Sequence, residues 1–211
     1  MILKDKVVMV SGIGPGLGKE LALEAAREGA LLAICARTAS KLDDSEADIR
    51  AAGFDNPVLK VPTDISDSAQ CKNFVDQTIA AYGRIDALIN SAYVPGSFAP
   101  LESAELDGWR QAMEVNLFGS VGLSQQVLPH MKANGGGAIV MINTMVARLP
   151  LAMQAGYAAS KAALSAATKH MAIEWGQYNV RVNAAHMGWM WGPPVEWHIN
   201  TLAKHKGTTM A

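Results

Sequence analysis

A tyrosine and a lysine stand four residues apart, Tyr157 and Lys161, in the alanine-rich segment AGYAASKAAL. If this segment is helical, as so much alanine favours, both side chains lie on one helix face. A phenol is a poor base at neutral pH, but a neighbouring ammonium stabilises the phenolate and lowers the phenol pKa. The pair could therefore carry acid–base chemistry, or it could be an incidental polar pair on a buried helix.

A glycine-rich stretch near the N-terminus, SGIGPGLGKELA, follows an apolar run. Glycines let the backbone approach a pyrophosphate, and the free N–H groups and dipole of a helix N-terminus favour its negative charge. The spacing of Gly12, Gly16 and Gly18 differs from the commoner fingerprint Gly-x-Gly-x-x-Gly. Its place after the first expected strand still favours a dinucleotide-binding turn over a purely structural one.

Ala36 and Arg37 end the second apolar run, where proteins that prefer NAD place an acidic residue for the ribose hydroxyls. Without a carboxylate a 2′-phosphate meets no repulsion, and Arg37 can bind it with two parallel hydrogen bonds. We therefore expect NADP(H) as the cofactor, with NAD(H) as the alternative. A solvated Arg37 at the start of a helix is the structural alternative.

Six short apolar runs could supply the strands that position these groups: 7–11, 31–35, 58–61, 86–90, 138–142 and 180–184. Many of the helical segments between them end on a glycine, the usual helix stop: Gly29, Gly53, Gly83, Gly135 and Gly176. This alternation predicts right-handed βαβ units, and thus an α/β fold with a doubly wound, Rossmann-like parallel sheet in a single domain. We expect residues 1–185 to form this domain and residues 186–211 to be an apolar lid segment belonging to it.

The composition limits the partners. Lys and Arg number 18 against 19 Asp and Glu, so no strong field recruits nucleic acid or an anionic membrane, and a small molecule is expected instead. With two cysteines, no membrane-length apolar run and no signal-peptide pattern, the sequence favours a cytoplasmic protein. His186, His198 and His205 lack the spacing of a metal site, so no metal is expected.

Taken in order, five motifs resemble those of the short-chain dehydrogenase/reductase family: SGIGPGLG, TDISD, LINSAY, MEVNLFG and YAASK. The resemblance runs from residue 6 to about residue 192. It implies hydride transfer between NADP(H) and a secondary alcohol or ketone, with Tyr157 as general acid/base and Lys161 lowering its pKa and binding the nicotinamide ribose. Asn116 resembles the residue that holds a water for the proton relay, although it could instead cap or pack.

The same resemblance implies cofactor contacts along the chain. Asp64 is similar to the residue that binds the adenine amino group, or it is simply a turn residue, and Asn90 is similar to the residue that fixes the sheet beside the cofactor. The expected cofactor-binding set is Gly12, Ile13, Gly14, Gly16, Leu17, Gly18, Arg37, Asp64, Ile65, Asn90, Ala92, Tyr157, Lys161 and Gly188. Relatives pair through helices matching 155–175 and 109–133, so a homodimer or homotetramer is expected.

Several positions depart from the family pattern. Thr144 replaces a Ser that binds the substrate carbonyl; it keeps a hydroxyl, but its methyl group crowds the pocket. Tyr93 replaces a glycine, so its loop must differ and Tyr93 can reach toward cofactor or substrate. Met187 replaces a proline, and Gly192 falls where a carboxamide-binding Thr is usual, which puts that contact in doubt.

The segment after the last expected strand is unusually apolar. Trp189, Met190 and Trp191, with Tyr93, are the candidate substrate residues, and they favour a lipophilic substrate unless they pack against other protein. Relatives continue past Ala211 with a further helix and strand, which are expected to be lacking here or to lie beyond an incomplete chain. These departures keep open a catalytically weak NADP(H)-binding sensor or scaffold, or reduction of a carbon–carbon double bond.

Overall fold

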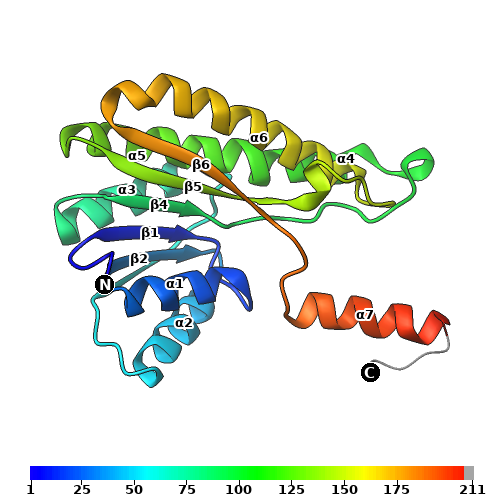
Figure 1. Ribbon diagram of the computed structural model, residues 1–211, viewed down its shortest axis with the longest axis horizontal. Coiled ribbons are helices and arrows are strands. Elements are labelled where there is room, and N and C mark those ends of the chain that lie inside the picture. The colour runs from blue at the N-terminus through cyan, green and yellow to red at the C-terminus, as the bar shows by residue number, and fades with distance from the viewer. Residues whose placement is uncertain (207–211) are drawn as a thin grey trace.

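One parallel sheet organises the chain. The computed structural model describes residues 1–206, except the side chains of residues 193, 194, 198, 202 and 204–206. Its six strands lie in the order β3-β2-β1-β4-β5-β6 (Figure 1). They are β1 Val7–Ser11, β2 Leu31–Ala36, β3 Val58–Pro62, β4 Ala87–Asn90, β5 Gly137–Thr144 and β6 Val180–Met187. The expected doubly wound fold is confirmed, with β5 and β6 running further toward their carboxyl ends than expected.

Helices connect the strands. They are α1 Leu17–Arg27, α2 Ala39–Ala51, α3 Ser68–Tyr82, α4 Leu106–Met113, α5 Ser120–Ala133, α6 Ala155–Trp175 and α7 Pro193–Lys206. A π-helical turn, Glu114–Gly119, joins α4 to α5, so the helix expected near 109–133 is interrupted in its middle. No helix was predicted for the segment that forms α7. Its sequence begins with two prolines, and proline is common in the first turn of a helix.

The helices form two layers on the sheet (Figure 1). Helices α1 and α2 cover one face, where Leu42 packs with Val8 and Leu32 of the strands. Helices α3, α5 and α6 cover the other face, where Phe74 and Leu123 pack with Ile139. None of the described helices is both long and apolar enough to cross a membrane.

Strand β6 lies at one edge of the described sheet. Val180 and Val182 are buried while Arg181 and Asn183 are exposed, the period-two pattern of a strand with one covered face. Strand β1, by contrast, is buried along its whole length. Within residues 1–206 β6 pairs with β5 alone, so its other edge has no partner strand there.

The helix ends largely follow the glycines. Gly83 ends α3 in the left-handed region, with φ of 74°. Helix α6 also ends at the expected glycine, but Gly176 keeps a helical φ of −57° and the chain continues into a short 3₁₀ turn. Asn179 takes the left-handed position instead, at φ 58°, and its side chain donates to the Gly135 carbonyl at 2.9 Å. Asn tolerates this conformation because its side chain can bond nearby backbone.

Close backbone packing shapes the turn between β1 and α1. Gly12 has a φ of +85°, and a Cβ there would collide with the main chain of Ala92 after β4. A Cβ on Gly18 would collide with the Gly12 carbonyl oxygen. Gly14, in contrast, has no atom within 4 Å of the place its Cβ would take. Gly12 and Gly18 therefore fix the turn, while Gly14 borders open space.

This difference predicts unequal effects of adding one methyl group. Gly18→Ala should lower the free energy of unfolding by about 1–3 kcal/mol, because backbone atoms must shift to admit it. The melting temperature should fall by roughly 2–4 °C for each kcal/mol lost. Gly14→Ala is the matched control, and its melting temperature should fall by less than that of Gly18→Ala. Both are measured by thermal unfolding without ligand. Equal losses in both variants would show that the turn is not packed as described.

Candidate functional site

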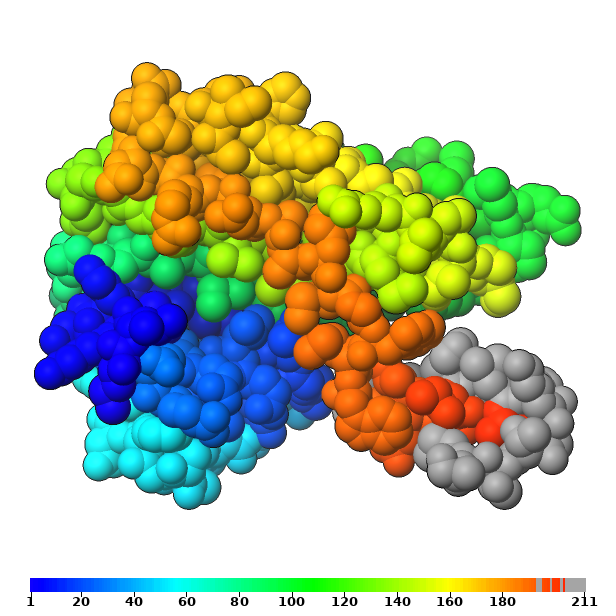
Figure 2. Space-filling view, in the orientation of Figure 1, coloured from blue at the N-terminus to red at the C-terminus, as the bar shows by residue number. Residues whose placement is uncertain are grey.

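A cavity of about 1240 Å³ opens at the carboxyl ends of the strands. The strand order reverses between β1 and β4, and ligands bind doubly wound sheets at this crevice. The glycine turn lines one side and the segment after β6 lines the other, crossing the front of the molecule in Figure 2. The cavity brings together every expected site residue except Asn90 and Asn116.

The glycine-turn half suits a phosphate. Gly16 precedes α1 and has no side chain to cap it, so the first N–H groups of this helix lack the partner that a capping side chain would give. Both Gly14 and Gly16 have open space where a Cβ would be. A helix N-terminus with such amides is a ready anion site. Gly12, Ile13, Leu17 and Gly18 line the same part of the cavity.

Arg37 and Asp64 line the cavity at the ends of β2 and β3. The Asp64 carboxylate accepts hydrogen bonds from the Ser66 hydroxyl at 2.7 Å and the Ser66 N–H at 3.0 Å. These bonds, helped by the charge of Arg37, hold the pKa of Asp64 below its usual value. Asp64 is therefore a turn residue that also borders the cavity, so its two alternatives are compatible. Ile65, Ala92 and Gly188 line the cavity as well.

Asn90 supports the site from behind the cavity. Its side chain is 1 % exposed and its Nδ2 donates to Ser124 Oγ at 2.9 Å, with Met141 Sδ at 3.3 Å. Its Oδ1 lies 3.5 Å from Ser11 Oγ. Asn90 thus ties β4 to β1, β5 and α5 beside the glycine turn.

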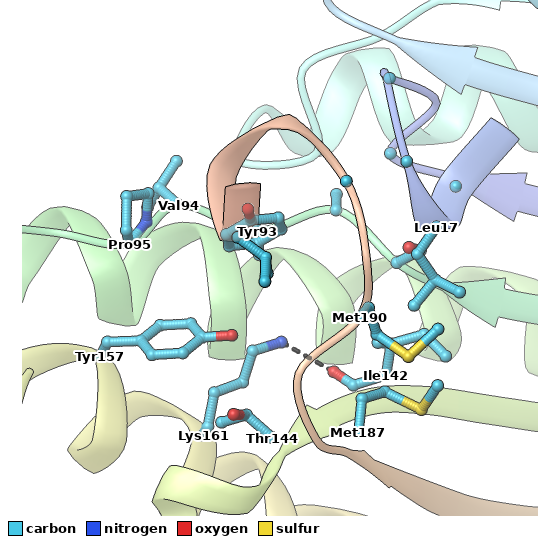
Figure 3. A pocket seen from close by; sticks show the side chains of 18 of the residues that line it. Leu17, Tyr93, Val94, Pro95, Ile142, Thr144, Tyr157, Lys161, Met187 and Met190 are labelled. Carbon is cyan, nitrogen blue, oxygen red and sulfur yellow. Dashed lines mark hydrogen bonds between the residues drawn. The ribbon is translucent and has the colours of Figure 1, made fainter. Parts of the chain in front are cut away.

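Tyr157 and Lys161 project from α6 into the cavity (Figure 3). Burial raises the Tyr157 pKa to about 12, with the charge of Tyr93 adding to the rise, while a hydrogen bond from Thr144 opposes it. Lys161 is 2 % exposed, and burial lowers its pKa to about 8. Its Nζ donates to the Ile142 carbonyl at 2.8 Å.

The expected lowering of the Tyr157 pKa by Lys161 is therefore not seen in the protein alone. The ammonium of Lys161 is bonded to the backbone of β5 rather than to the phenol. Burial of the phenol then dominates, since it disfavours the charged form.

Thr144 ends β5 within reach of Tyr157. Its N–H donates to Asn143 Oδ1 at 2.8 Å, and its Oγ1 accepts from the Val146 N–H at 3.4 Å. Thr144 and Tyr157 both line the cavity, and the Thr144 hydroxyl is near enough to the phenol to favour its charged form. A carbonyl oxygen there could interact with both hydroxyls.

Asn116 lies outside the cavity and clamps two segments together. It sits in the π-helical turn and is fully buried. Its Oδ1 accepts from the Val94 N–H at 2.8 Å, while its Nδ2 donates to the Val94 carbonyl at 2.9 Å and to Ser160 Oγ at 3.0 Å. Both N–H bonds of the side chain are thus used within the protein. The structural alternative for this residue is realised, and its role toward a water stays a prediction.

Two supporting residues escaped the sequence reasoning. Asn143 donates to the Lys161 carbonyl and to Ser165 Oγ, both at 3.0 Å, and so fixes α6 against the end of β5. Ser160 donates to the Tyr157 carbonyl at 2.8 Å. Ser160 stands inside the YAASK motif and Asn143 directly before Thr144, but their types alone do not reveal buried partners.

The remaining half of the cavity is apolar. Tyr93, Trp189, Met190, Trp191 and Trp197 line it. Other residues of this lining were not singled out by the sequence: Val94, Pro95, Phe98, Val115, Met145, Val146, Leu151, Ala152, Met153 and Val195. Tyr93 has no positive φ, so it occupies the usual glycine position without backbone strain. Met187 and Gly192, which depart from the family pattern, also line the cavity.

A metal site has no support among the side chains described. No three His, Cys, Asp or Glu side chains among them lie close enough to hold an ion. His186 places Nδ1 3.3 Å from the Thr144 carbonyl. The side chains of His198 and His205 lie outside the described residues.

Known proteins share both sequence and shape with this chain. The family model described as short chain dehydrogenase matches residues 6–199. Levodione reductase of Leifsonia aquatica is 34 % identical over 91 % of this chain and 72 % of its own length. The 11-beta-hydroxysteroid dehydrogenase-like 2 protein of Arabidopsis thaliana is 35 % identical over 75 % of this chain, but the match covers 51 % of that protein, so the chain spans about half its length.

Solved structures agree with the sequence matches. The crystal structure of levodione reductase has a TM-score of 0.91 and 32 % identity, covering 97 % of this chain and 79 % of the other. The L-sorbose reductase of Gluconobacter frateurii, complexed with NADPH and L-sorbose, has a TM-score of 0.90 and 29 % identity over 98 % and 78 % of the two chains. With the sheet order, the glycine turn and the Tyr157–Lys161 pair on one cavity, these matches establish that the chain belongs to the short-chain dehydrogenase family of oxidoreductases.

Proposed function

We propose that the protein transfers a hydride between NADP(H) and a lipophilic ketone or the corresponding secondary alcohol. One observation carries this proposal: a single cavity is lined at one end by Arg37 and by the N-terminus of α1, which has no side-chain cap. Tyr157, Thr144 and Lys161 line the same cavity. Its volume of about 1240 Å³ exceeds the 300–1,000 Å³ usual for one small ligand, which suits a dinucleotide together with a substrate.

The residues present fit a nicotinamide dinucleotide. The α1 N-terminus would hold the pyrophosphate, Arg37 a 2′-phosphate, and Asp64 and Ile65 the adenine side. When bound, the nicotinamide ring supplies or accepts the hydride. Lys161 would contact its ribose, which requires the ammonium to share or leave its bond with the Ile142 carbonyl.

Tyr157 is the proposed proton donor for ketone reduction. Its raised pKa keeps the phenol protonated at neutral pH, which is the state that can donate to a carbonyl oxygen. The Thr144 hydroxyl would donate to the same oxygen and hold it in place. In alcohol oxidation Tyr157 must act as the phenolate, and the charge of Lys161 would then favour that form.

The substrate side supports a lipophilic compound. Named relatives act on different compounds: their names include levodione reductase, L-fucose dehydrogenase and 11-beta-hydroxysteroid dehydrogenase. The apolar lining around Phe98, Met153 and Trp191 favours the less polar of these types here. We assign residues 187–201 to the proposed lid, which lies within the lid segment 186–211 expected from the sequence.

The alternative is a catalytically weak NADP(H)-binding sensor or scaffold. Met187 and Gly192, where the family has a proline and a carboxamide-binding Thr, favour it. Against it, Tyr157, Lys161 and Thr144 lie together on the cavity. We also propose a homodimer or homotetramer and a cytoplasmic location, the latter because Cys35 and Cys71 are free and buried.

Removing the Tyr157 hydroxyl tests the central assignment. Tyr157→Phe should lower kcat for ketone reduction by roughly 10²–10⁴-fold, because the proton donor is lost. NADPH binding, followed by fluorescence titration, should persist, and product analysis should identify an alcohol. Tyr178→Phe is the control, because Tyr178 precedes β6 at the amino ends of the strands and does not line the cavity. Unchanged turnover in Tyr157→Phe would contradict the assignment of Tyr157 as proton donor.

The role of Thr144 toward the substrate oxygen can be tested by removing its hydroxyl group in one variant and its methyl group in another. Thr144→Ala should lower kcat by about 10²–10³-fold if the hydroxyl stabilises the substrate oxygen. Thr144→Ser keeps the hydroxyl and should retain most of the activity while accepting bulkier substrates, as measured by steady-state kinetics on a ketone series. If neither variant changes turnover, Thr144 does not serve the substrate oxygen.

Arg37 decides the proposed cofactor preference. Arg37→Ala should weaken NADPH binding relative to NADH by roughly 10–150-fold, the loss of a charged hydrogen-bonding partner worth about 1.5–3 kcal/mol. The two dissociation constants are measured by fluorescence titration. Lys41→Ala is the matched control, because Lys41 is a nearby cation that pairs with Asp44 at 3.6 Å. A preference that Arg37→Ala leaves intact contradicts the role given to Arg37.

A further inference from the structure

The loop after β4 places a second phenol beside Tyr157. The rings of Tyr93 and Tyr157 have centroids 6.0 Å apart and planes inclined by 54°. Aromatic pairs prefer such tilted arrangements over stacked ones at this distance. Tyr93 is 53 % exposed and lines the cavity, so its ring is available to a ligand (Figure 3). The two rings form one aromatic surface next to the reacting hydroxyl, which we call the tyrosine wall.

The tyrosine wall is fixed from behind. Val94, directly after Tyr93, bonds through both its N–H and its carbonyl to the buried Asn116 side chain, at 2.8 and 2.9 Å. Asn116 in turn donates to Ser160 at 3.0 Å, and Ser160 donates to the Tyr157 carbonyl at 2.8 Å. A chain of buried and partly buried hydrogen bonds therefore links the backbones that carry the two rings. Such preorganisation lowers the entropy lost when a ligand packs on the wall.

Flat side chains also line the rest of this half of the cavity. Phe98, Trp189, Trp191 and Trp197 all border it. Beyond the hydroxyl groups of the tyrosine wall and Thr144, the uncharged polar side chains of the whole described lining, apart from the tryptophan indoles, are Thr63, Ser91, Asn143, Gln154 and Thr201. The charged residues among the described lining, Arg37, Asp64 and Lys161, belong to the cofactor half or to the catalytic pair. This half therefore offers flat apolar area and little to compensate a buried charge.

We propose that Tyr93 determines substrate specificity, and that the tyrosine wall selects neutral ketones and alcohols carried on rigid alicyclic ring systems over open-chain ones of equal size. A rigid ring presents its face to the wall without freezing rotatable bonds, whereas each immobilised rotor costs an open chain part of its affinity. The inference rests on the proposed function and narrows its substrate class. It assigns Tyr93 contact with the substrate body, while Tyr157 keeps contact with the substrate oxygen.

The test compares two ketones with the same number of carbons, bicyclic 2-decalone and linear 2-decanone. The wild-type protein should show a higher kcat/KM for 2-decalone, and Tyr93→Ala should reduce the ratio of the two values by about tenfold or more. Tyr93→Phe keeps the ring and should hold the ratio within about threefold. Tyr178→Ala makes the same truncation away from the cavity, at the amino ends of the strands, and serves as control. Thermal unfolding checks that each variant is folded.

Calorimetric titration of both ketones into the cofactor-free protein gives a second readout. The wild-type dissociation constant should be lower for 2-decalone, and Tyr93→Ala should raise that constant by several-fold more than the one for 2-decanone. Equal affinities of the wild type for the two ketones, or an unchanged ratio in folded Tyr93→Ala, overturns the inference. If Tyr93→Phe loses the preference for 2-decalone over 2-decanone, the inference is also overturned, because the hydroxyl group rather than the ring would then select the substrate. Absence of turnover with any ketone would contradict the proposed function alone, since the titration still decides the role of Tyr93.

Discussion

The buried amide of Asn116 is the interaction on which the geometry of the site depends. Three of its hydrogen bonds join Val94, after β4, to Ser160 on α6. Those segments carry Tyr93 and Tyr157, so one amide sets the spacing of the two rings. Asn116 itself is fully buried, so removing one of its partners leaves a buried donor or acceptor unpaired, which costs more than the bond itself contributes. The π-helical turn is what brings Asn116 into this position, and such turns often occur at functional sites.

Burial gives the catalytic pair its electrostatic character. Lys161 and Tyr157 shift in opposite directions on the pKa scale, since each loses solvation of its charged form. The Ile142 carbonyl compensates the Lys161 ammonium in the protein alone. In the protein alone the phenol is therefore neutral, and the lysine beside it holds its proton less tightly than a lysine in water. Forming the phenolate requires further positive charge near Tyr157. The sequence spacing predicted that the two side chains share a face, but not how strongly the cavity desolvates them.

Much of the fold followed from local patterns, whereas the support of the site did not. Runs of β-branched and apolar residues located all six strands, because strands buried in a parallel sheet are apolar throughout. The cavity residues Gly12, Arg37 and Lys161 also emerged from motifs. The Val94–Asn116–Ser160 chain escaped, since hydrogen bonds between residues far apart in sequence leave no periodic trace. The left-handed residue after α6 escaped for a related reason: the helix ends at Gly176 as predicted, but Asn179 takes the left-handed position, and its side chain donates to the carbonyl of Gly135, which is distant in sequence.

The pairing of β1 with β4 has a consequence for how the site is assembled. Ser11 lies opposite Asn90 in this register, and the loop that continues from Asn90 packs its main chain against Gly12. The cofactor crevice therefore does not exist until strands far apart in the chain have joined, and such non-local pairing is slow to form. A ligand of this crevice binds only the finished sheet, so it stabilises the native state by mass action and does nothing for partly folded chains. Ligand binding would then report completed folding as well as function.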